Sequence, residues 1–257
     1  MSNAPALQLR NVDYSYSGRN GPVPAVDGLS LDIEVGSFLS IIGPSGCGKS
    51  TLLRLLAGLL FPDRGEVLDD GQPVGGPDPR RGIVFQKPQL YPWLTVGKNV
   101  EFGPKMRGLP RAERKRLAAQ YVEMVRLTEF AKSYPYELSG GMQQRAALAR
   151  VLANDPKVLL MDEPFGALDA LTREHLQDEL REIWRSTGKT IVLVTHSVEE
   201  AVYLGTRVLV LSDRPARALA DIPVSFSTNG TRGLGREVKA RPEFIKVREE
   251  VLRYVWT

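Results

Sequence analysis

The residues 43–50 read GPSGCGKS and fit the pattern G-x-x-x-x-G-K-[ST]. A short apolar run, 38–42, precedes them and a leucine-rich stretch, 50–60, follows, which predicts a strand, a glycine loop and a buried helix. In such a loop backbone N–H groups cradle phosphate oxygens, Lys49 reaches the β- and γ-phosphates, and the Ser50 hydroxyl ligates Mg²⁺. A glycine-rich turn that binds nothing is the alternative, and the flanking pattern favours a nucleoside triphosphate site. The expected nucleotide-binding residues are Gly43, Pro44, Ser45, Gly46, Cys47, Gly48, Lys49, Ser50 and Thr51.

An acidic pair stands at the end of a second apolar run, 158–161. Asp162 follows this predicted strand and can hold Mg²⁺ through a water, as a Walker-B aspartate does. Glu163 comes next, and beyond the strand end its carboxylate can face the γ-phosphate and polarise an attacking water as a general base. Adjacent acids at a strand end also form solvated turns, but the phosphate loop favours the catalytic interpretation.

Each of the two histidines follows a different pattern. His196 comes directly after an apolar run, 190–195. The carboxyl ends of parallel strands lie along one edge of a sheet, so Gly43, Asp162 and His196 would meet there. We therefore expect His196 to contact the γ-phosphate, although a lone histidine after a strand is more often a surface residue. His175 falls on the polar face of a predicted helix and is expected to have no such role.

The segment 138–145 reads LSGGMQQR and places two glycines at the start of a predicted helix. Ser139 is expected to cap this helix, which creates a second anion-binding N-terminus. One nucleotide does not need both N-termini from one chain, so the pattern favours a two-fold dimer in which each chain covers its partner's nucleotide. The residues expected to face the partner's nucleotide are Leu138, Ser139, Gly140, Gly141, Met142 and Gln143.

The composition of the 257 residues excludes several other kinds of site. The single cysteine, Cys47, excludes a disulfide framework and a CxxC zinc site, and two histidines are too few for a His-rich metal centre. Lys plus Arg number 34 against 30 Asp plus Glu, and the net charge of +4 is small for a dedicated nucleic-acid binder. No apolar run approaches the roughly 18 to 20 residues of a membrane span and no secretory signal is visible, so we expect a cytosolic chain.

The remaining patterns predict the order of the elements. Alternating apolar residues over 29–35 predict an antiparallel strand, and the density of glycine and proline over 71–110 argues against long regular elements there. Helices are predicted around 118–125 and over 139–153, after which short apolar strands alternate with helices, as in a parallel sheet covered on both faces. These later strands are 157–161, 190–195 and 207–211, and the later helices are 170–187, 198–204 and 242–255.

The motifs in this order resemble those of the ATP-binding cassette (ABC) ATPases, and the resemblance extends to about Asp213. It implies that Tyr16, or less well Tyr14, stacks on adenine, and that Gln86 contacts Mg²⁺ and water from a loop that faces a transmembrane partner. It also makes 138–142 the signature motif, 166–169 the D-loop and His196 the switch histidine. Among the D-loop residues it singles out Asp169. ATP and Mg²⁺ are the implied cofactors, and the implied metal ligands are Ser50, Gln86 and Asp162.

The resemblance also implies an α/β fold, in which a P-loop NTPase (RecA-like) core carries an N-terminal antiparallel β subdomain and an inserted α-helical subdomain. The β subdomain and the first part of the core would occupy 1–87, and the α-helical signature subdomain 88–155. The second part of the core would occupy 156–212, followed by a short C-terminal extension, 213–257.

Within the family, residues 81–86 (RGIVFQ) and 90–96 (LYPWLTV) look like the nitrate, sulfonate and taurine type of bacterial importer ATPase. The resemblance then implies ATP hydrolysis that energises uptake of a small anionic solute through separate membrane permease subunits. The implied partners are a second copy of the chain, the permease and, indirectly, a substrate-binding protein, at the cytoplasmic face of the inner membrane.

Three alternatives remain open at this point: an importer ATPase for another solute class, an ABC ATPase that acts on nucleic acid, and a P-loop kinase or regulator without a transporter. Repair members of the family insert a long coiled coil and translation members usually fuse two cassettes. The sequence shows neither feature, so no nucleic-acid partner is expected. The signature motif argues against the third alternative.

Three single residues add expectations of their own. Met142 stands where many family members carry Gln, and its side chain is expected to point away from the anion site. Ser197 stands where Asp is usual after the switch histidine, and Ser is itself a competent helix cap. Cys47, as the only thiol, is expected to make ATPase activity sensitive to alkylation. An incidental small residue at a variable position is the alternative for Cys47.

Overall fold

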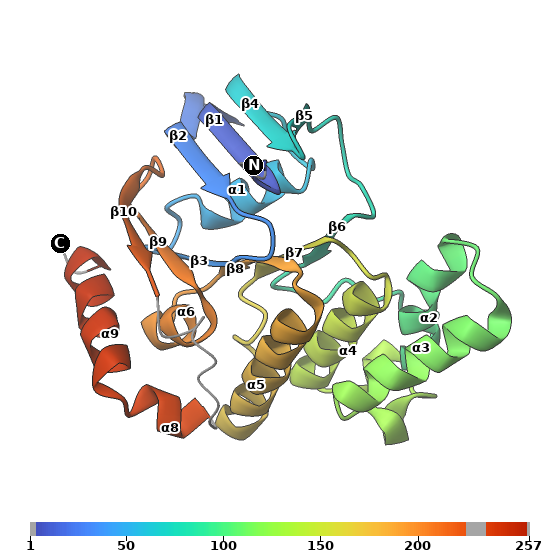
Figure 1. Ribbon diagram of the computed structural model, residues 1–257. Helices are drawn as coiled ribbons and strands as arrows, with labels where there is room; N and C mark the ends of the chain where they lie inside the picture. The colour runs from blue at the N-terminus through green and yellow to red at the C-terminus, as the bar shows by residue number, and fades with distance from the viewer. Residues whose placement is uncertain (1–3, 225–234, 256–257) are drawn as a thin grey trace.

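The computed structural model describes residues 4–224 and 235–255, which form two sheets and a set of helices (Figure 1). The first sheet is antiparallel, with the strand order β2-β1-β4-β5. Its strands are β1 (Leu7–Gly18), β2 (Gly21–Ile33), β4 (Arg64–Asp69) and β5 (Gln72–Pro73). The expected N-terminal antiparallel part of the fold is thereby confirmed.

The second sheet has the strand order β10-β9-β3-β8-β7-β6 and is parallel except for the edge pair of β10 with β9. Its strands are β3 (Phe38–Ile42), β6 (Arg81–Val84), β7 (Val158–Asp162), β8 (Thr190–Val194), β9 (Arg207–Leu211) and β10 (Ala218–Pro223). Strands β3, β7 and β8 are buried along their whole length, as expected of parallel strands that are covered on both faces.

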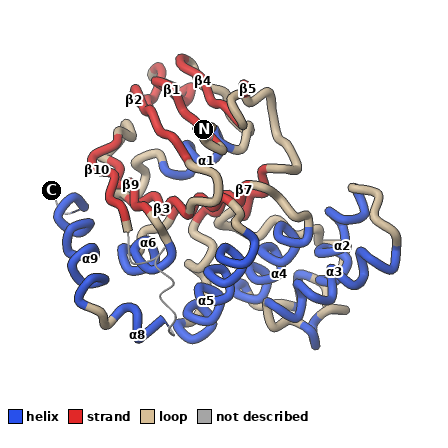
Figure 2. The backbone as a smooth tube through the Cα atoms, in the orientation of Figure 1, coloured by secondary structure: helices blue, strands red, loops and turns tan. Residues whose placement is uncertain are grey.

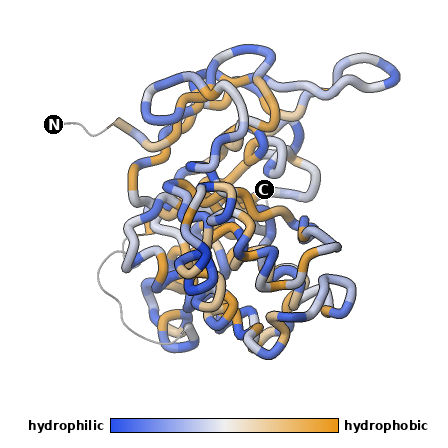
Figure 3. Tube along the Cα trace, turned by 90° about the vertical axis from the view of Figure 1, so that its right-hand side faces the viewer, coloured by the Kyte–Doolittle hydropathy of each residue, from blue (hydrophilic) through white to orange (hydrophobic). Residues whose placement is uncertain are grey.

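The two faces of this parallel sheet belong to different hydrophobic clusters. Leu39 and Val192 face one cluster, which includes α1 (Lys49–Leu56) and the first sheet, so that α1 lies between the two sheets. Phe38 and Leu193 alternate with them and face the other cluster, which includes the helices on the far side. Figure 3 shows the hydrophobic stretches of the trace gathered in the interior, while the outlying loops are more hydrophilic.

Three helices lie between β6 and β7 in the chain, and Figure 2 shows them grouped at one end of the molecule. They are α2 (Val96–Met106), α3 (Arg111–Met124) and α4 (Gly140–Ala153). The remaining helices are α5 (Ala170–Thr187), α6 (Val198–Leu204), α8 (Gly235–Lys239) and α9 (Pro242–Val255). No helix in the described part of the chain is long and apolar enough to cross a membrane.

Several boundary predictions were wrong. The strand predicted over 29–35 ends at Ile33, and Val35 is 58% exposed. The helix predicted over 50–60 ends at Leu56, because Gly58 adopts a positive φ of 73° and turns the chain. Strand β7 starts and ends one residue later than predicted, and β8 ends one residue earlier.

Helix α2 and strand β10 formed where no element was predicted. Helix α2 has 11 residues inside the glycine- and proline-rich segment and contains Pro104. This proline lies in the last turn, where the loss of one backbone donor does not stop the helix from forming. Strand β10 lies in the weakly patterned C-terminal region, and Ile222 is its only buried residue.

Candidate functional site

The phosphate-loop sequence joins β3 to α1 at the carboxyl edge of the parallel sheet. Gly46 and Gly48 have φ angles of 79° and 122°, and a Cβ atom on Gly48 would lie 2.5 Å from the Ala25 carbonyl oxygen. Both positions therefore require glycine. The Lys49 ammonium is buried and donates to the carbonyl oxygens of Gly43 and Pro44, at 2.7 Å each.

An open cavity of about 380 Å³ lies in front of this loop. Residues from five segments that are distant in sequence line it, so the fold brings together positions that the motifs mark separately. They are Tyr16, Ala25, Ser45, Gly46, Gly48, Lys49, Ser50, Thr51, Gln86, Glu163 and Arg214. Gly43, Pro44 and Cys47 belong to the loop but are not among these lining residues.

Asp162 ends β7 beside the start of α1, and its Oδ1 accepts a hydrogen bond of 3.0 Å from the Ser50 hydroxyl. Burial raises the pKa of Asp162, donation from Ser50 opposes the rise, and the nearby charge of Glu163 adds to it. A bound cation would reverse this balance, because it favours the ionised carboxylate. The paired hydroxyl and carboxylate oxygens are the hard ligands that Mg²⁺ prefers.

Glu163 follows Asp162 at the end of β7, and its carboxylate contacts residues that follow β6 and β8. Its Oε2 accepts a hydrogen bond of 2.9 Å from the Gln86 amide, two residues beyond β6. The same oxygen lies 3.4 Å from Nδ1 of His196, two residues beyond β8. His196 is 65% exposed at its side chain, so its ring stands at the open side of the site. Glu163 itself adopts a φ of 45°, which is uncommon for a residue with a side chain.

Tyr16 and Tyr14 come from β1, but only Tyr16 is among the residues that line the cavity. The Tyr16 hydroxyl lies 3.1 Å from the Thr51 hydroxyl oxygen, which fixes the ring above the start of α1. Tyr14 meets Tyr16 edge to face, with ring centroids 5.0 Å apart, and packs against the core. The geometry thus favours Tyr16 over Tyr14 as the ring that can stack on the adenine base.

Arg214 is a cavity residue that the sequence reasoning missed. It follows β9, and its Nε donates to the Pro24 carbonyl oxygen at 2.8 Å. No motif marks this arginine, because its place beside the loop depends on the pairing of residues 25–27 with Ala216. The only signal in the sequence is a basic residue close to the carboxyl end of a predicted parallel strand.

The glycine pair at the start of α4 lies away from this cavity. Ser139 caps α4, because its hydroxyl accepts from the Met142 backbone N–H at 3.3 Å. The Met142 side chain packs against the core, which confirms that it points inward. The Gln143 amide donates to the carbonyl oxygens of Pro135, at 2.9 Å, and Leu138, at 3.2 Å, so it is turned toward its own chain. Among the described residues, 138–143 do not line the nucleotide-sized cavity.

Two further residues of the motifs cap helices. Asp169 caps α5 by accepting from the Thr172 backbone N–H at 3.0 Å, and this hydrogen bond lowers the pKa of Asp169. Ser197 caps α6 by accepting from the Glu200 backbone N–H at 3.3 Å. Ser197, the residue after His196, therefore caps the helix as expected.

Cys47 does not fit the expectation of a reactive thiol. Its side chain is only 1% exposed and packs in the cluster that contains α1. Burial raises the pKa of Cys47, and the opposing effect of the Lys49 charge is smaller. The expectation of alkylation sensitivity is wrong for the folded chain, because both access and thiolate formation are reduced.

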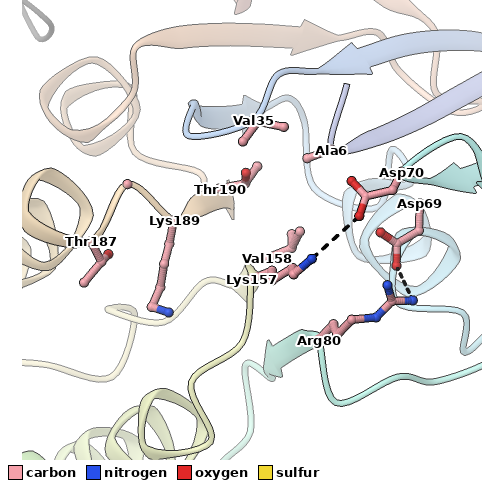
Figure 4. A pocket seen from close by; sticks show the side chains of 11 residues that line it. Ala6, Val35, Asp69, Asp70, Arg80, Lys157, Val158, Thr187, Lys189 and Thr190 are labelled. Carbon is pink, nitrogen blue, oxygen red and sulfur yellow. Dashed lines mark ion pairs between the residues drawn. The ribbon is translucent and has the colours of Figure 1, made fainter. Parts of the chain in front are cut away.

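A second cavity, of about 330 Å³, lies at the opposite end of the strands, near the starts of β7 and β8. Figure 4 shows Arg80 directed toward Asp69 and Lys157 directed toward Asp70, while Lys189, which pairs with Asp155, points away from them. Arg80 lies 3.5 Å from Asp69, and Lys157 lies 3.9 Å from Asp70. Because these charges are paired, this cavity lacks the uncompensated positive character of a phosphate site.

Comparison with known proteins agrees with this geometry. The family described as "ABC transporter" matches residues 26–166. The taurine import ATP-binding protein TauB of Roseobacter denitrificans is 48% identical over 251 residues, which cover 97% of this chain and 94% of that protein. An uncharacterized ABC transporter ATP-binding protein of Methanocaldococcus jannaschii is 47% identical and covers 96% of this chain and 93% of its own length.

Solved structures show the same fold. An ATP-binding cassette in a dimeric post-hydrolysis state, bound to ADP and Pi, superposes with a TM-score of 0.78 at 35% identity. The match covers 85% of this chain and 98% of that structure. This confirms the P-loop NTPase fold and the resemblance that the motifs indicated. The chain therefore belongs to the ABC transporter family of ATP-binding proteins and is an ATPase.

Proposed function

We propose that this chain is the ATP-hydrolysing subunit of an importer that takes up a small anionic solute of the taurine, alkanesulfonate or nitrate type. The observation that carries the ATPase part is the single cavity that Lys49, Ser50 and Glu163 line together. Relatives named as taurine import ATP-binding proteins support the solute class, since several of them align over nearly the whole chain. They do not favour an ABC ATPase that acts on nucleic acid.

In this proposal the phosphate loop binds the triphosphate and Tyr16 stacks on the adenine. The Lys49 ammonium already lies at the loop, where it is held by backbone carbonyl oxygens, and it would exchange these partners for phosphate oxygens. Backbone N–H groups at the start of α1 carry no side-chain cap and are free to receive the phosphates. The preformed loop therefore needs little rearrangement to bind.

Ser50, Asp162 and Gln86 would hold Mg²⁺. When bound, this ion would neutralise part of the charge on the phosphates. The 3.0 Å contact between Ser50 and Asp162 places two suitable oxygens together, and the Gln86 amide approaches the same region through Glu163. Burial raises the pKa of Asp162, and a bound cation would oppose that rise because it stabilises the ionised carboxylate.

Glu163 is the general base of the proposal. Its carboxylate borders the cavity, so it can accept the proton of a water that attacks the γ-phosphate. Gln86 and His196 both reach its Oε2, at 2.9 and 3.4 Å, and would orient the carboxylate and the water. As charge develops on the phosphate, His196 and Lys49 would interact with it directly.

The distance of 138–143 from the chain's own cavity supports a dimer in which this segment covers the partner's ATP. Gly140 leaves the N-terminus of α4 open, since no atom beyond its chain neighbours and its own helix backbone lies within 4 Å of its Cβ position, whereas Gly141 packs against Ala167 and Leu168. Asp169 would lie at the same interface. The related cassette solved as a dimer adds support. Residues 88–155 would pass the closing motion to membrane permease subunits at the cytoplasmic face, with a binding protein that delivers the solute.

The test is reconstitution of the chain with the permease and the binding protein that co-purify with it, in liposomes loaded with ATP. We expect taurine, an alkanesulfonate or nitrate to stimulate ATP hydrolysis and to accumulate in the same liposomes. A chain with Lys49→Ala, assembled in the same way, should show neither effect. Basal ATPase activity that no such anion stimulates would reject the solute class while leaving the ATPase assignment in place.

A further inference from the structure

Glu200 is a buried carboxylate to which the proposed mechanism gives no role. It lies in α6 and is 8% exposed, whereas its neighbour Glu199 is exposed. A buried carboxylate is costly unless it is hydrogen-bonded and paired with a positive charge. Its partners in the described structure lie directly after β8 and in α5, so the carboxylate connects these two parts of the fold.

The first partner is Thr195, directly before His196. The Thr195 hydroxyl donates to Oε2 of Glu200 at 2.6 Å and accepts from the Ser197 backbone N–H at 3.1 Å. The Thr195 backbone N–H donates to the Ile41 carbonyl oxygen at 3.1 Å, next to the phosphate loop. Glu200 thereby fixes the residues on both sides of His196.

The other oxygen of Glu200 faces α5. Its Oε1 accepts from the Gln177 amide at 3.2 Å and lies 3.8 Å from Nε of Arg173. Arg173 in turn donates to the Phe165 carbonyl oxygen at 3.3 Å and to the Leu168 carbonyl oxygen at 2.9 Å. These carbonyls belong to the segment between Glu163 and Asp169, which leads into α5.

We propose that Glu200 is a positioning residue for ATP hydrolysis, because its carboxylate joins the His196 segment to the segment 165–169 through Thr195 and Arg173. One carboxylate holds both segments in register with Glu163, which reaches His196 at 3.4 Å. The inference rests on the proposed function, since it gives Glu163 and His196 their roles. It concerns catalytic geometry and not nucleotide affinity, because none of Glu200, Thr195 and Arg173 is among the residues that line the cavity.

The sharpest variant is Glu200→Gln, which keeps the shape of the side chain. The glutamine oxygen can still accept from Thr195, but its NH₂ group then faces the donors of Gln177 and Arg173. We expect kcat for ATP hydrolysis to fall about tenfold to 100-fold, since a misplacement of about 1 Å costs roughly 100-fold in rate. The Kd for ATP, measured by fluorescence titration, should change less than about threefold. The matched control is Glu199→Gln, on the exposed side of α6, which should keep the wild-type kcat.

Two further measurements separate positioning from a loss of stability. The chain has only two histidines, so the ring resonances of His196 can be followed by NMR, with His175 as an internal reference. We expect Glu200→Gln to shift the His196 signals and to leave those of His175 in place. Arg173→Met should lower kcat in the same way, and the double variant should be no worse than the poorer single variant, because both changes break one connection.

Arg173 keeps 39% of its side chain exposed, so Arg173→Met carries the test if Glu200→Gln does not fold. A wild-type kcat in either folded variant would overturn the inference, as would equal losses of kcat and ATP affinity. Strictly multiplicative losses in the double variant would also overturn it. The proposed function fails on a different result, namely absence of ATP hydrolysis by the wild-type chain with its permease.

Discussion

At the scale of single residues, Cys47 lies in the phosphate loop but its sulfur faces the interior. Because burial raises the pKa of Cys47, the folded protein should react with iodoacetamide at least about tenfold more slowly than the urea-unfolded protein at pH 8. The rate for the folded protein should still be rising at pH 9, since the thiolate forms only at higher pH. Mass spectrometry of timed samples measures this. Rapid labelling of the folded chain at pH 8 would contradict the buried position, and Cys47→Ser supplies the blank.

Arg214 leads to a second expectation at this scale. Its guanidinium borders the nucleotide cavity beside Tyr16, so we expect Arg214→Ala to raise the Kd for ATP about three- to tenfold by removing a charged hydrogen-bond donor. Arg217 lies on the same loop, pairs with Asp27 and is not among the cavity residues, which makes Arg217→Ala the control. Equal affinities of the two variants in calorimetric titrations would remove Arg214 from the site.

The motif residues could be predicted because short local patterns of residue types identify their chemistry. The loop 43–50 and the pair Asp162–Glu163 each combine residue types with a strand end, which is enough to identify them. Arg214 and Glu200 could not be predicted in the same way, since their partners lie 190 positions away, at Pro24, or in a different helix, at Gln177. Such contacts follow from the tertiary fold and leave no periodic or motif signal.

At the scale of elements, patterns predicted best where both ends of a segment carry a signal of their own. Strand β3 and helix α5 have the predicted bounds, because the strand is buried throughout and runs into the glycine loop, and the helix has a capping Asp169 and a closing Gly188. Strand β10 was not predicted, since it is an edge strand with one buried residue. Helix α2 was not predicted, since the density of glycine and proline over 71–110 argued against a helix there. Tertiary contacts determine the secondary structure of these two segments.

Gly65 and Gly71 allow a controlled test of the first sheet. Both have positive φ angles, 76° and 75°, but a Cβ on Gly65 would lie 2.3 Å from the Arg10 carbonyl oxygen, whereas nothing lies within 4 Å at Gly71. Gly71→Ala should cost about 1 kcal/mol of unfolding free energy from the backbone conformation alone. Gly65→Ala should cost about 1–3 kcal/mol more, because β4 must move away from β1.

Urea unfolding followed by circular dichroism measures both changes. Equal destabilisation by the two alanines would mean that β4 does not approach β1 as closely as the fold requires. The pair isolates the steric effect, since both substitutions add the same methyl group at nearly the same φ.

At the scale of the whole molecule, the site is shared if residues 138–143 cover the partner's nucleotide. ATP turnover per chain should then fall as the protein is diluted through the dissociation range of the dimer, because each site needs a second copy. The affinity for ADP, whose expected contacts all lie within one chain, should not depend on protein concentration. Turnover that stays constant over a hundredfold dilution, into the range where sedimentation shows monomers, would contradict a shared site.

The central claim is that Glu163 is the base in a cavity that binds ATP through the phosphate loop. The most direct measurement is the ATPase rate and the ATP affinity of Glu163→Gln, with Glu129→Gln as the control on the exposed surface. We expect ATP affinity within about threefold of wild type and a loss of about 10²- to 10⁴-fold in turnover, with normal turnover in the control. Unchanged turnover in Glu163→Gln would contradict it.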